Sequence, residues 1–126
     1  MPTPKPKTKP RTFTLHDPIY QADIFVSAGT QQQWATNRFA RLIGRPPIQV
    51  EPDPYRLGNC TYRTDFKGCL IWFRDPSPGV GVITHEAFHA TRHVLTSSGV
   101  GWSEDSEEAW AYFIEWLVKS IGNKLW

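Results

Sequence analysis

The sequence predicts an α+β fold in which a small antiparallel or mixed sheet packs on helices. Two pairs of short β-rich runs, over residues 12–29 and 60–75, are bounded by turn residues and indicate strands. Apolar residues at helical spacing indicate one helix between the two pairs and two helices after them. The chain has 126 residues, of which 40% are hydrophobic, so it is long and apolar enough for one core without disulfide or metal support.

Residues 1–11 are expected to form a disordered, basic, proline-rich tail before a single domain over residues 12–126. Lysine or arginine alternates with proline in this segment, and such a composition keeps a chain extended and solvated. The whole chain carries a formal charge of +2, and without the tail it is close to neutral. A nucleic-acid-binding body is therefore not favoured.

The sequence also predicts a cytoplasmic protein with no membrane partner. No apolar run approaches the roughly 18 residues that a membrane helix needs, and no apolar segment of the secretory type follows the basic N-terminus. The two cysteines, Cys60 and Cys69, would then be reduced. They flank a predicted hairpin turn without facing each other, so two free, buried thiols are expected.

The elements before the hairpin follow from turn and cap signals. Residues 12–29 predict two strands separated by an Asp-Pro turn. A helix is expected next, because Thr30 and Gln33 have the spacing of a capping box. Apolar residues then recur on one helical face, and Gly44 is expected to end the helix. Residues 45–59 hold four prolines, which indicates a surface loop.

Two helices follow the hairpin. The first is expected to start at Asp75 or Ser77, each of which precedes a proline, and to end near Gly99. The second is expected to start with Ser103 as its N-cap and to end at Gly122. Because this last helix is apolar on nearly every side, it is predicted either to be central to the core or to join two copies of the chain.

The first of these helices carries the segment VITHEAFHATRHVL, which has the HExxH pattern. His85 and His89 stand one helical turn apart, so both imidazoles can face one ion. Glu86 would lie beside the ion, where it can take a proton from a bound water. Imidazole ligands favour zinc, which lowers the pKa of bound water to about 7. Manganese, cobalt or nickel would fit the same ligands less commonly.

Two further histidine arrangements are excluded. A metzincin motif would require glycine and histidine where the chain has Arg92 and Leu95. His93 lies two turns beyond His85, roughly 12 Å along the helix axis, so the two cannot bind one ion. His93 is expected to pack or to lie on the surface.

A catalytic zinc site needs a third protein ligand, and a glutamate of the last helix is the candidate. Glu107 and Glu108 follow His89 by 18 and 19 residues. For either to reach the site, the last helix has to cross the preceding one at an angle. Glu108 is preferred because it shares a face with Tyr112 and Glu115, in a segment otherwise too apolar to leave a carboxylate inside.

Together these residues resemble the gluzincin branch of zinc metallopeptidases. HEAFH followed by EEAWAY is similar to small HExxH proteins encoded in tailed-phage genomes and, more loosely, to ImmA/IrrE-type peptidases. The resemblance covers residues 70–118 and implies a minimal zincin-like domain in the host cytoplasm. It implies the zinc ligands His85, His89 and Glu108, with Glu86 as general base. Thermolysin-like members place an aspartate four residues after the ligand glutamate, whereas this chain has tyrosine there.

That departure leaves two roles open. The candidates to orient a ligand histidine are Glu104, Asp105 and Glu115. The candidates to bind an oxyanion are Tyr62, His93 and Tyr112.

The expected function is that of a zinc-dependent peptidase, in which Glu86 deprotonates a zinc-bound water that attacks a peptide carbonyl. The apolar strand over residues 68–75 enters the site region, and its edge is expected to pair with an extended peptide. The alternative is a zincin-like module without turnover that binds a protein in phage assembly or a host factor. A third reading is a metal-free helix that carries histidines by chance.

Overall fold

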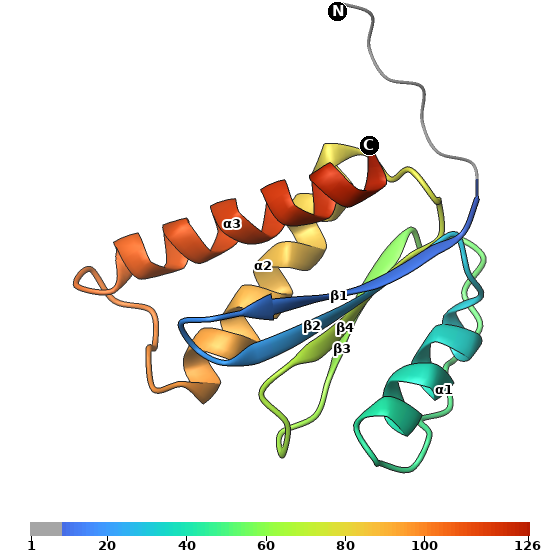
Figure 1. Cartoon of the computed structure of the whole chain (residues 1–126), viewed down its shortest axis with the longest axis horizontal. Coiled ribbons are helices and arrows are strands. Elements are labelled where there is room, and N and C mark those ends of the chain that lie inside the picture. The colour runs from blue at the N-terminus through green and yellow to red at the C-terminus, as the bar shows by residue number, and fades with distance from the viewer. Residues whose placement is uncertain (1–8) are drawn as a thin grey trace, which may run out of the picture.

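The computed structural model describes residues 9–126, so the first eight residues of the tail expected over residues 1–11 lie outside this range. Within it the fold is α+β, as predicted: four strands form one mixed sheet and three helices cover it (Figure 1). The strands are β1 (Arg11–Asp17), β2 (Ala22–Ala28), β3 (Gly58–Tyr62) and β4 (Cys69–Phe73). The helices are α1 (Gln32–Leu42), α2 (Val80–Ser97) and α3 (Glu107–Leu125). Strand β1 therefore begins at the last residue assigned to the tail.

The strand order is β1-β2-β4-β3, so β4 lies inside the sheet. It pairs parallel with β2 and antiparallel with β3, and Ile71 stands opposite Val26 on one side and Cys60 on the other. The prediction that this strand offers a free edge to a peptide is therefore wrong. Its residues are all between 0 and 4% exposed, and a strand that is apolar on both faces is typical of an interior position. The edge strand beside α2 is β3.

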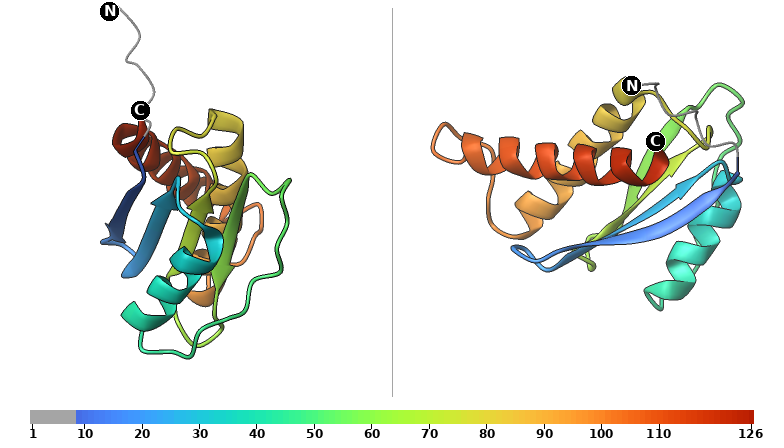
Figure 2. Two further views of the ribbon diagram at one scale, coloured as in Figure 1. Left: turned by 90° about the vertical axis from the view of Figure 1, so that its right-hand side faces the viewer. Right: turned by 45° about the horizontal axis from the view of Figure 1, so that its top comes forward.

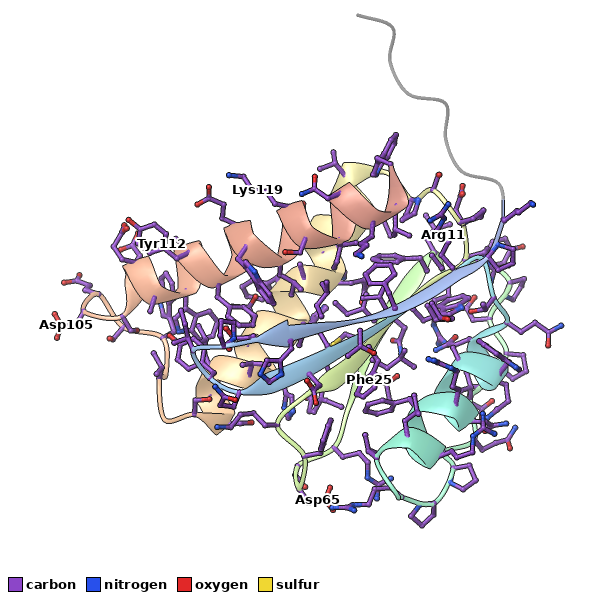
Figure 3. All side chains as sticks on the ribbon, viewed as in Figure 1. Arg11, Phe25, Asp65, Asp105, Tyr112 and Lys119 are labelled. Carbon is purple, nitrogen blue, oxygen red and sulfur yellow. The ribbon has the colours of Figure 1, made fainter. Side chains whose placement is uncertain are left out.

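The alternation of side chains along β4 divides the core between two layers. Leu70 and Trp72 pack with Ala35 and Phe39 of α1, while Ile71 and its neighbours pack in the larger cluster with α2 and α3. Figure 2 shows α1 on one face of the sheet and the other two helices on the opposite face. Phe25 projects from β2 toward α1 (Figure 3). The sheet thus lies between α1 on one face and the pair of α2 and α3 on the other (Figure 2).

Helix α1 begins without the expected capping box. The hydroxyl of Thr30 hydrogen-bonds to that of Ser27 at 2.6 Å, and Gln33 bonds the backbone of Val50 and Ile48 in the following loop. The Gln33 side chain therefore fastens the loop to the helix instead of capping it. The expected end is confirmed, since Gly44 follows the helix with a φ of 68°, a conformation that favours glycine.

The other two helices begin later than the sequence indicated. Helix α2 starts after Gly79. Helix α3 has Ser106 as its N-cap residue, because Ser103 and Ser106 hydrogen-bond to each other in a turn that precedes the helix. Helix α3 also continues through Gly122 to Leu125, which is fully buried. The burial of this leucine outweighs the roughly 1 kcal/mol that glycine costs inside a helix.

Both cysteines are free, as expected, although only Cys69 is buried and Cys60 is half-buried. A hydrogen bond to Cys60 and burial raise the pKa of the Cys69 thiol, so this sulfur stays protonated and is a poor metal ligand. Among residues 9–126, no helix combines the length and apolar character needed to cross a membrane.

Candidate metal centre

His85 and His89 lie near the middle of α2, and the structure brings their rings together. Their Nε2 atoms are 3.3 Å apart, and the ring planes are inclined at 70°. Two nitrogens bound to one tetrahedral zinc at 2.0–2.1 Å would be separated by about 3.3–3.4 Å. The spacing of the two imidazole nitrogens thus fits a shared zinc ion. Both residues are exposed, so an ion can reach them from solvent.

Glu86 lies on the side of α2 that faces β3 and is 5% exposed. Its Oε1 atom is 3.8 Å from Nε2 of His85, and within the described chain no group donates a hydrogen bond to its carboxylate. Burial raises the pKa of Glu86, while the charges of His85 and His89 act in the opposite direction. The result is a buried, unengaged carboxylate beside two imidazoles, the environment of a general base.

Gly58, the first residue of β3, makes room for this carboxylate. A Cβ atom at Gly58 would lie 3.0 Å from Cγ of Glu86 and 3.2 Å from Cγ1 of Val82. It would also lie 3.3 Å from the carbonyl oxygen of Trp72 on β4. A side chain at this position would therefore force its neighbours on α2 or β4 to shift by a few tenths of an ångström, and glycine permits the close approach without that shift.

Glu107 and Glu108 are both exposed in the first turn of α3. Residues 9–126 contain no group of three or more histidine, cysteine, aspartate or glutamate side chains arranged to hold one metal ion. The structure therefore does not place Glu108 with His85 and His89. Carboxylates in the first turn of a helix are favoured by the helix dipole whether or not a metal is present.

Helix α3 does cross α2 at an oblique angle, as a ligand from α3 requires (Figure 1). The crossing brings Trp110 to Phe88, whose ring centroids are 6.4 Å apart. Phe88 precedes His89 in the motif. The first turns of α3 therefore lie against the same part of α2 that carries the histidine pair.

The remaining candidate side chains have other contacts. Nε2 of His93 is 2.8 Å from the carbonyl oxygen of Phe66, and its ring stacks on Tyr62 with the centroids 4.5 Å apart. His93 is buried, so it ties α2 to the β3–β4 hairpin, as its packing interpretation predicts. Tyr112 lines a separate apolar hollow beside the β1–β2 turn.

No residue of the described chain orients the two histidines from behind. Neither Nδ1 atom of His85 or His89 has a hydrogen-bond partner among residues 9–126. Of the three acidic candidates for this role, Glu115 pairs with Lys119, Asp105 points away from the body of the molecule (Figure 3), and Glu104 is exposed in the loop before α3. The imidazole pair is therefore held by helix geometry and by the hydrogen bond between its own two Nε2 atoms.

Two surface hollows flank the histidine pair along the gap between α2 and β3. The first is lined by Tyr62, Thr64, His89, Arg92, His93, Thr96 and Ser97. The second is lined by Tyr55, Arg56, Leu57, Gly58, Gly81, Val82, His85 and Glu86. Sequence reasoning did not identify Gly58 or these hollows. Only Arg92 had a usable signal, since it follows His89 by three residues and so lies on the same side of α2.

The chain matches no protein-family model, no curated protein and no solved structure.

Proposed function

We propose that this protein is a zinc-dependent hydrolase that acts on peptides. The observation that carries the proposal is the 3.3 Å distance between the Nε2 atoms of His85 and His89, which suits two ligands of one tetrahedral zinc. The adjacent carboxylate of Glu86 adds the base that hydrolysis needs. A helix that had collected histidines by chance would have no reason to bury this carboxylate against a glycine on the neighbouring strand.

In this proposal His85 and His89 would hold a zinc ion through their Nε2 atoms. Bound zinc supplies a Lewis acid that polarises a carbonyl oxygen and acidifies a water molecule. The carboxylate of Glu86 would accept a proton from a water molecule beside the histidine pair and pass it to the leaving amine. Because burial raises its pKa, Glu86 is a stronger base than an exposed glutamate once it is ionised.

The free edge of β3 supports a peptide as substrate. This strand pairs only with β4 within the described sheet, and it lies beside α2, so its outer backbone groups are available to an extended chain. The two hollows at either end of the histidine pair would receive side chains of such a peptide. We therefore propose β3, in place of β4, as the strand whose edge pairs with an extended peptide.

Glu108 remains our proposed third ligand. Its exposed side chain would turn toward the histidines when zinc binds, and Glu107 is the alternative at the neighbouring position. The variants Glu108→Ala and Glu107→Ala form a matched pair, since both remove a first-turn carboxylate from α3. Zinc affinity should fall in Glu108→Ala and stay unchanged in Glu107→Ala. The reverse pattern would assign the ligand to Glu107.

The deciding experiment is elemental analysis of protein purified without chelator or a histidine tag. We expect about one zinc per chain, with zinc lost in His89→Ala and retained in His16→Ala, which removes a histidine on β1 far from the pair. Hydrolysis of a peptide mixture should then disappear in Glu86→Gln. Protein without zinc, which also takes none up when zinc is added, would refute the proposal.

A zincin-like module that binds a protein without turnover is the second candidate. It is favoured by the lack of a third ligand beside the histidines in residues 9–126 and by two exposed aromatic residues near the start of α3. These are Trp102 and Tyr112, which are 65% and 66% exposed. Zinc binding without any hydrolysis, in the wild type and Glu86→Gln alike, would support this candidate. Cytoplasmic location, a phage origin and self-association through α3 remain predictions.

A further inference from the structure

The hollow next to His89 differs in charge from the rest of the α2–β3 gap. Its volume is about 310 Å³, and it lies between the C-terminal half of α2 and the end of β3. None of its seven lining residues is acidic. Its polar groups are one guanidinium, two imidazoles and several hydroxyls, so donors of hydrogen bonds predominate in it.

Arg92 supplies the positive charge of this hollow. It follows His89 by one helical turn, about 4.5 Å along the axis, on the stripe of α2 that also carries His85 and Thr96. In the described part of the chain its guanidinium has no hydrogen-bond or ion-pair partner. A guanidinium presents several donors in a planar fork that matches a carboxylate.

Three hydroxyl groups stand around Arg92 in the same hollow. They belong to Thr64, Thr96 and Ser97, and no protein group of residues 9–126 hydrogen-bonds to any of their side chains. Each can rotate to donate a hydrogen bond to an anion. The hollow therefore contains one unpaired cation and three uncommitted donors around a space with no negative charge.

The arginine of the opposite hollow provides the contrast. The Nη1 atom of Arg56 bonds to Gln32 and to the carbonyl oxygen of Glu51, and its Nη2 atom is 3.9 Å from the carboxylate of Asp53. Arg56 is thus committed to holding the loop before β3. Two large exposed side chains, Tyr55 and Leu57, lie next to it in the same hollow.

We propose that the hollow formed around Arg92 is a subsite for a carboxylate of the bound peptide, either an acidic side chain or the C-terminal carboxylate. This inference deepens the proposed function and rests on it for the position of the cleaved bond. The peptide would lie along β3 with its carboxylate beyond His89. The protein would thus prefer peptides that carry a negative charge at a fixed distance on that side of the cleaved bond.

The affinity of the protein for peptide probes tests this preference. It is measured by NMR titration of ¹⁵N-labelled Glu86→Gln protein and of metal-free wild-type protein, because neither is expected to hydrolyse the probes. The probes are acetyl-Ala-Glu-Ala-amide, the neutral acetyl-Ala-Gln-Ala-amide, and acetyl-Ala-Gln-Ala with a free C-terminal carboxylate. We expect at least one charged probe to bind roughly threefold tighter than the neutral one, the scale of an exposed ion pair. The first and third probes distinguish the two sources of the carboxylate. The shifted amides should include those of Thr96 and Ser97.

Arg92→Gln should bind all three probes equally. Arg41→Gln is the matched control, since it removes an exposed arginine on α1, across the sheet, and should keep the preference. The difference should also shrink in 0.5 M salt because the pair is exposed. Equal affinities in the parent protein, binding of no probe, or a preference that survives in Arg92→Gln would overturn the subsite.

Cleavage of a mixed peptide library, read by mass spectrometry, separates this inference from the proposed function. We expect acidic residues, or a free C-terminus, to be enriched at one fixed distance from the cleaved bond, and Arg92→Gln to lose this enrichment. Hydrolysis without any such enrichment would overturn the subsite and keep the hydrolase. Preferential binding without hydrolysis would keep the subsite and refute the hydrolase.

Discussion

Glu86 is a buried carboxylate beside two imidazoles, and opposing effects govern its charge. Burial favours its neutral form, while positive charge on His85 and His89 would favour the carboxylate. Since burial is the larger effect, the metal-free protein holds this side chain at a free-energy cost whenever it is ionised.

We expect Glu86→Gln to stabilise the metal-free protein at neutral pH. The folded-state pKa of Glu86 is raised above its ordinary value of 4.5, so stability that is present below pH 4.5 is lost as the pH rises through the folded pKa. Because glutamine stays neutral at every pH, the Glu86→Gln variant does not lose this stability. The melting temperature of Glu86→Gln minus that of the wild type should grow from pH 4 to pH 7. The exposed Glu115→Gln should show no such growth.

Gly58→Ala is expected to disturb the same carboxylate from the other side. The added methyl group would lie 3.0 Å from Cγ of Glu86, and overpacking of this kind costs about 1–3 kcal/mol. Urea unfolding measures this loss. Gly81→Ala is the control, because its Cβ would meet nothing within 4 Å and alanine favours a helix by roughly 0.5–1 kcal/mol. Equal stability of both variants would contradict the close approach of β3 to α2.

The contrast between the histidine pair and Gly58 shows what local sequence can predict at this scale. His85 and His89 meet because a helix repeats every 3.6 residues, so their spacing alone predicts the contact. Gly58 meets Glu86 through the pairing of β3 with β4 and the packing of α2. No local pattern around Gly58 records that contact, and the same holds for the hollow around Arg92.

Among the elements, β4 is the central one, because it pairs with both β2 and β3 and its side chains enter the core on both faces of the sheet. The apolar run of this strand predicted a buried strand correctly, yet its edge position was wrong because the sequence does not state which strands become neighbours. The parallel pairing with β2 is a long-range choice that needs the connection through α1. The helix starts were misplaced because neither helix begins with the expected signal. Helix α2 starts after Gly79, which has no capping side chain, and Ser103 bonds Ser106 in a turn before α3 instead of capping the helix.

We expect Ile71→Ala to destabilise the protein by about 2–5 kcal/mol, the usual cost of deleting a buried isoleucine side chain to alanine. Ile71 is fully buried in the middle of β4 between two strands. Ile19→Ala serves as the control, since Ile19 is 77% exposed in the β1–β2 turn and should cost less than about 0.5 kcal/mol. Urea unfolding measures both variants. A small loss in Ile71→Ala would place β4 at an edge.

At the scale of the whole molecule, the sheet is a platform with α1 below and the site-bearing helices above (Figure 2). The α+β class followed from the order of the patterns in the sequence. The third ligand did not follow, because it depends on the rotation of α3 about its own axis as it crosses α2. A helix that is apolar over most of its surface leaves that rotation undetermined.

Zinc should stabilise the folded chain as a unit. A ligand that binds only the folded state at a hundred times its dissociation constant adds about 2.7 kcal/mol to the free energy of unfolding. We expect the melting temperature to rise with zinc in the wild type and in His16→Ala, and not in His89→Ala. An equal rise in His89→Ala would show that zinc binds somewhere other than the histidine pair.

The glycine under Glu86 has a consequence for ancestry. A lineage that keeps the buried carboxylate is constrained at the start of β3, because a Cβ there would crowd the glutamate, a valine of α2 and the backbone of β4. The most direct way to accept a larger residue at position 58 is thus a second change among the neighbours that its Cβ would crowd.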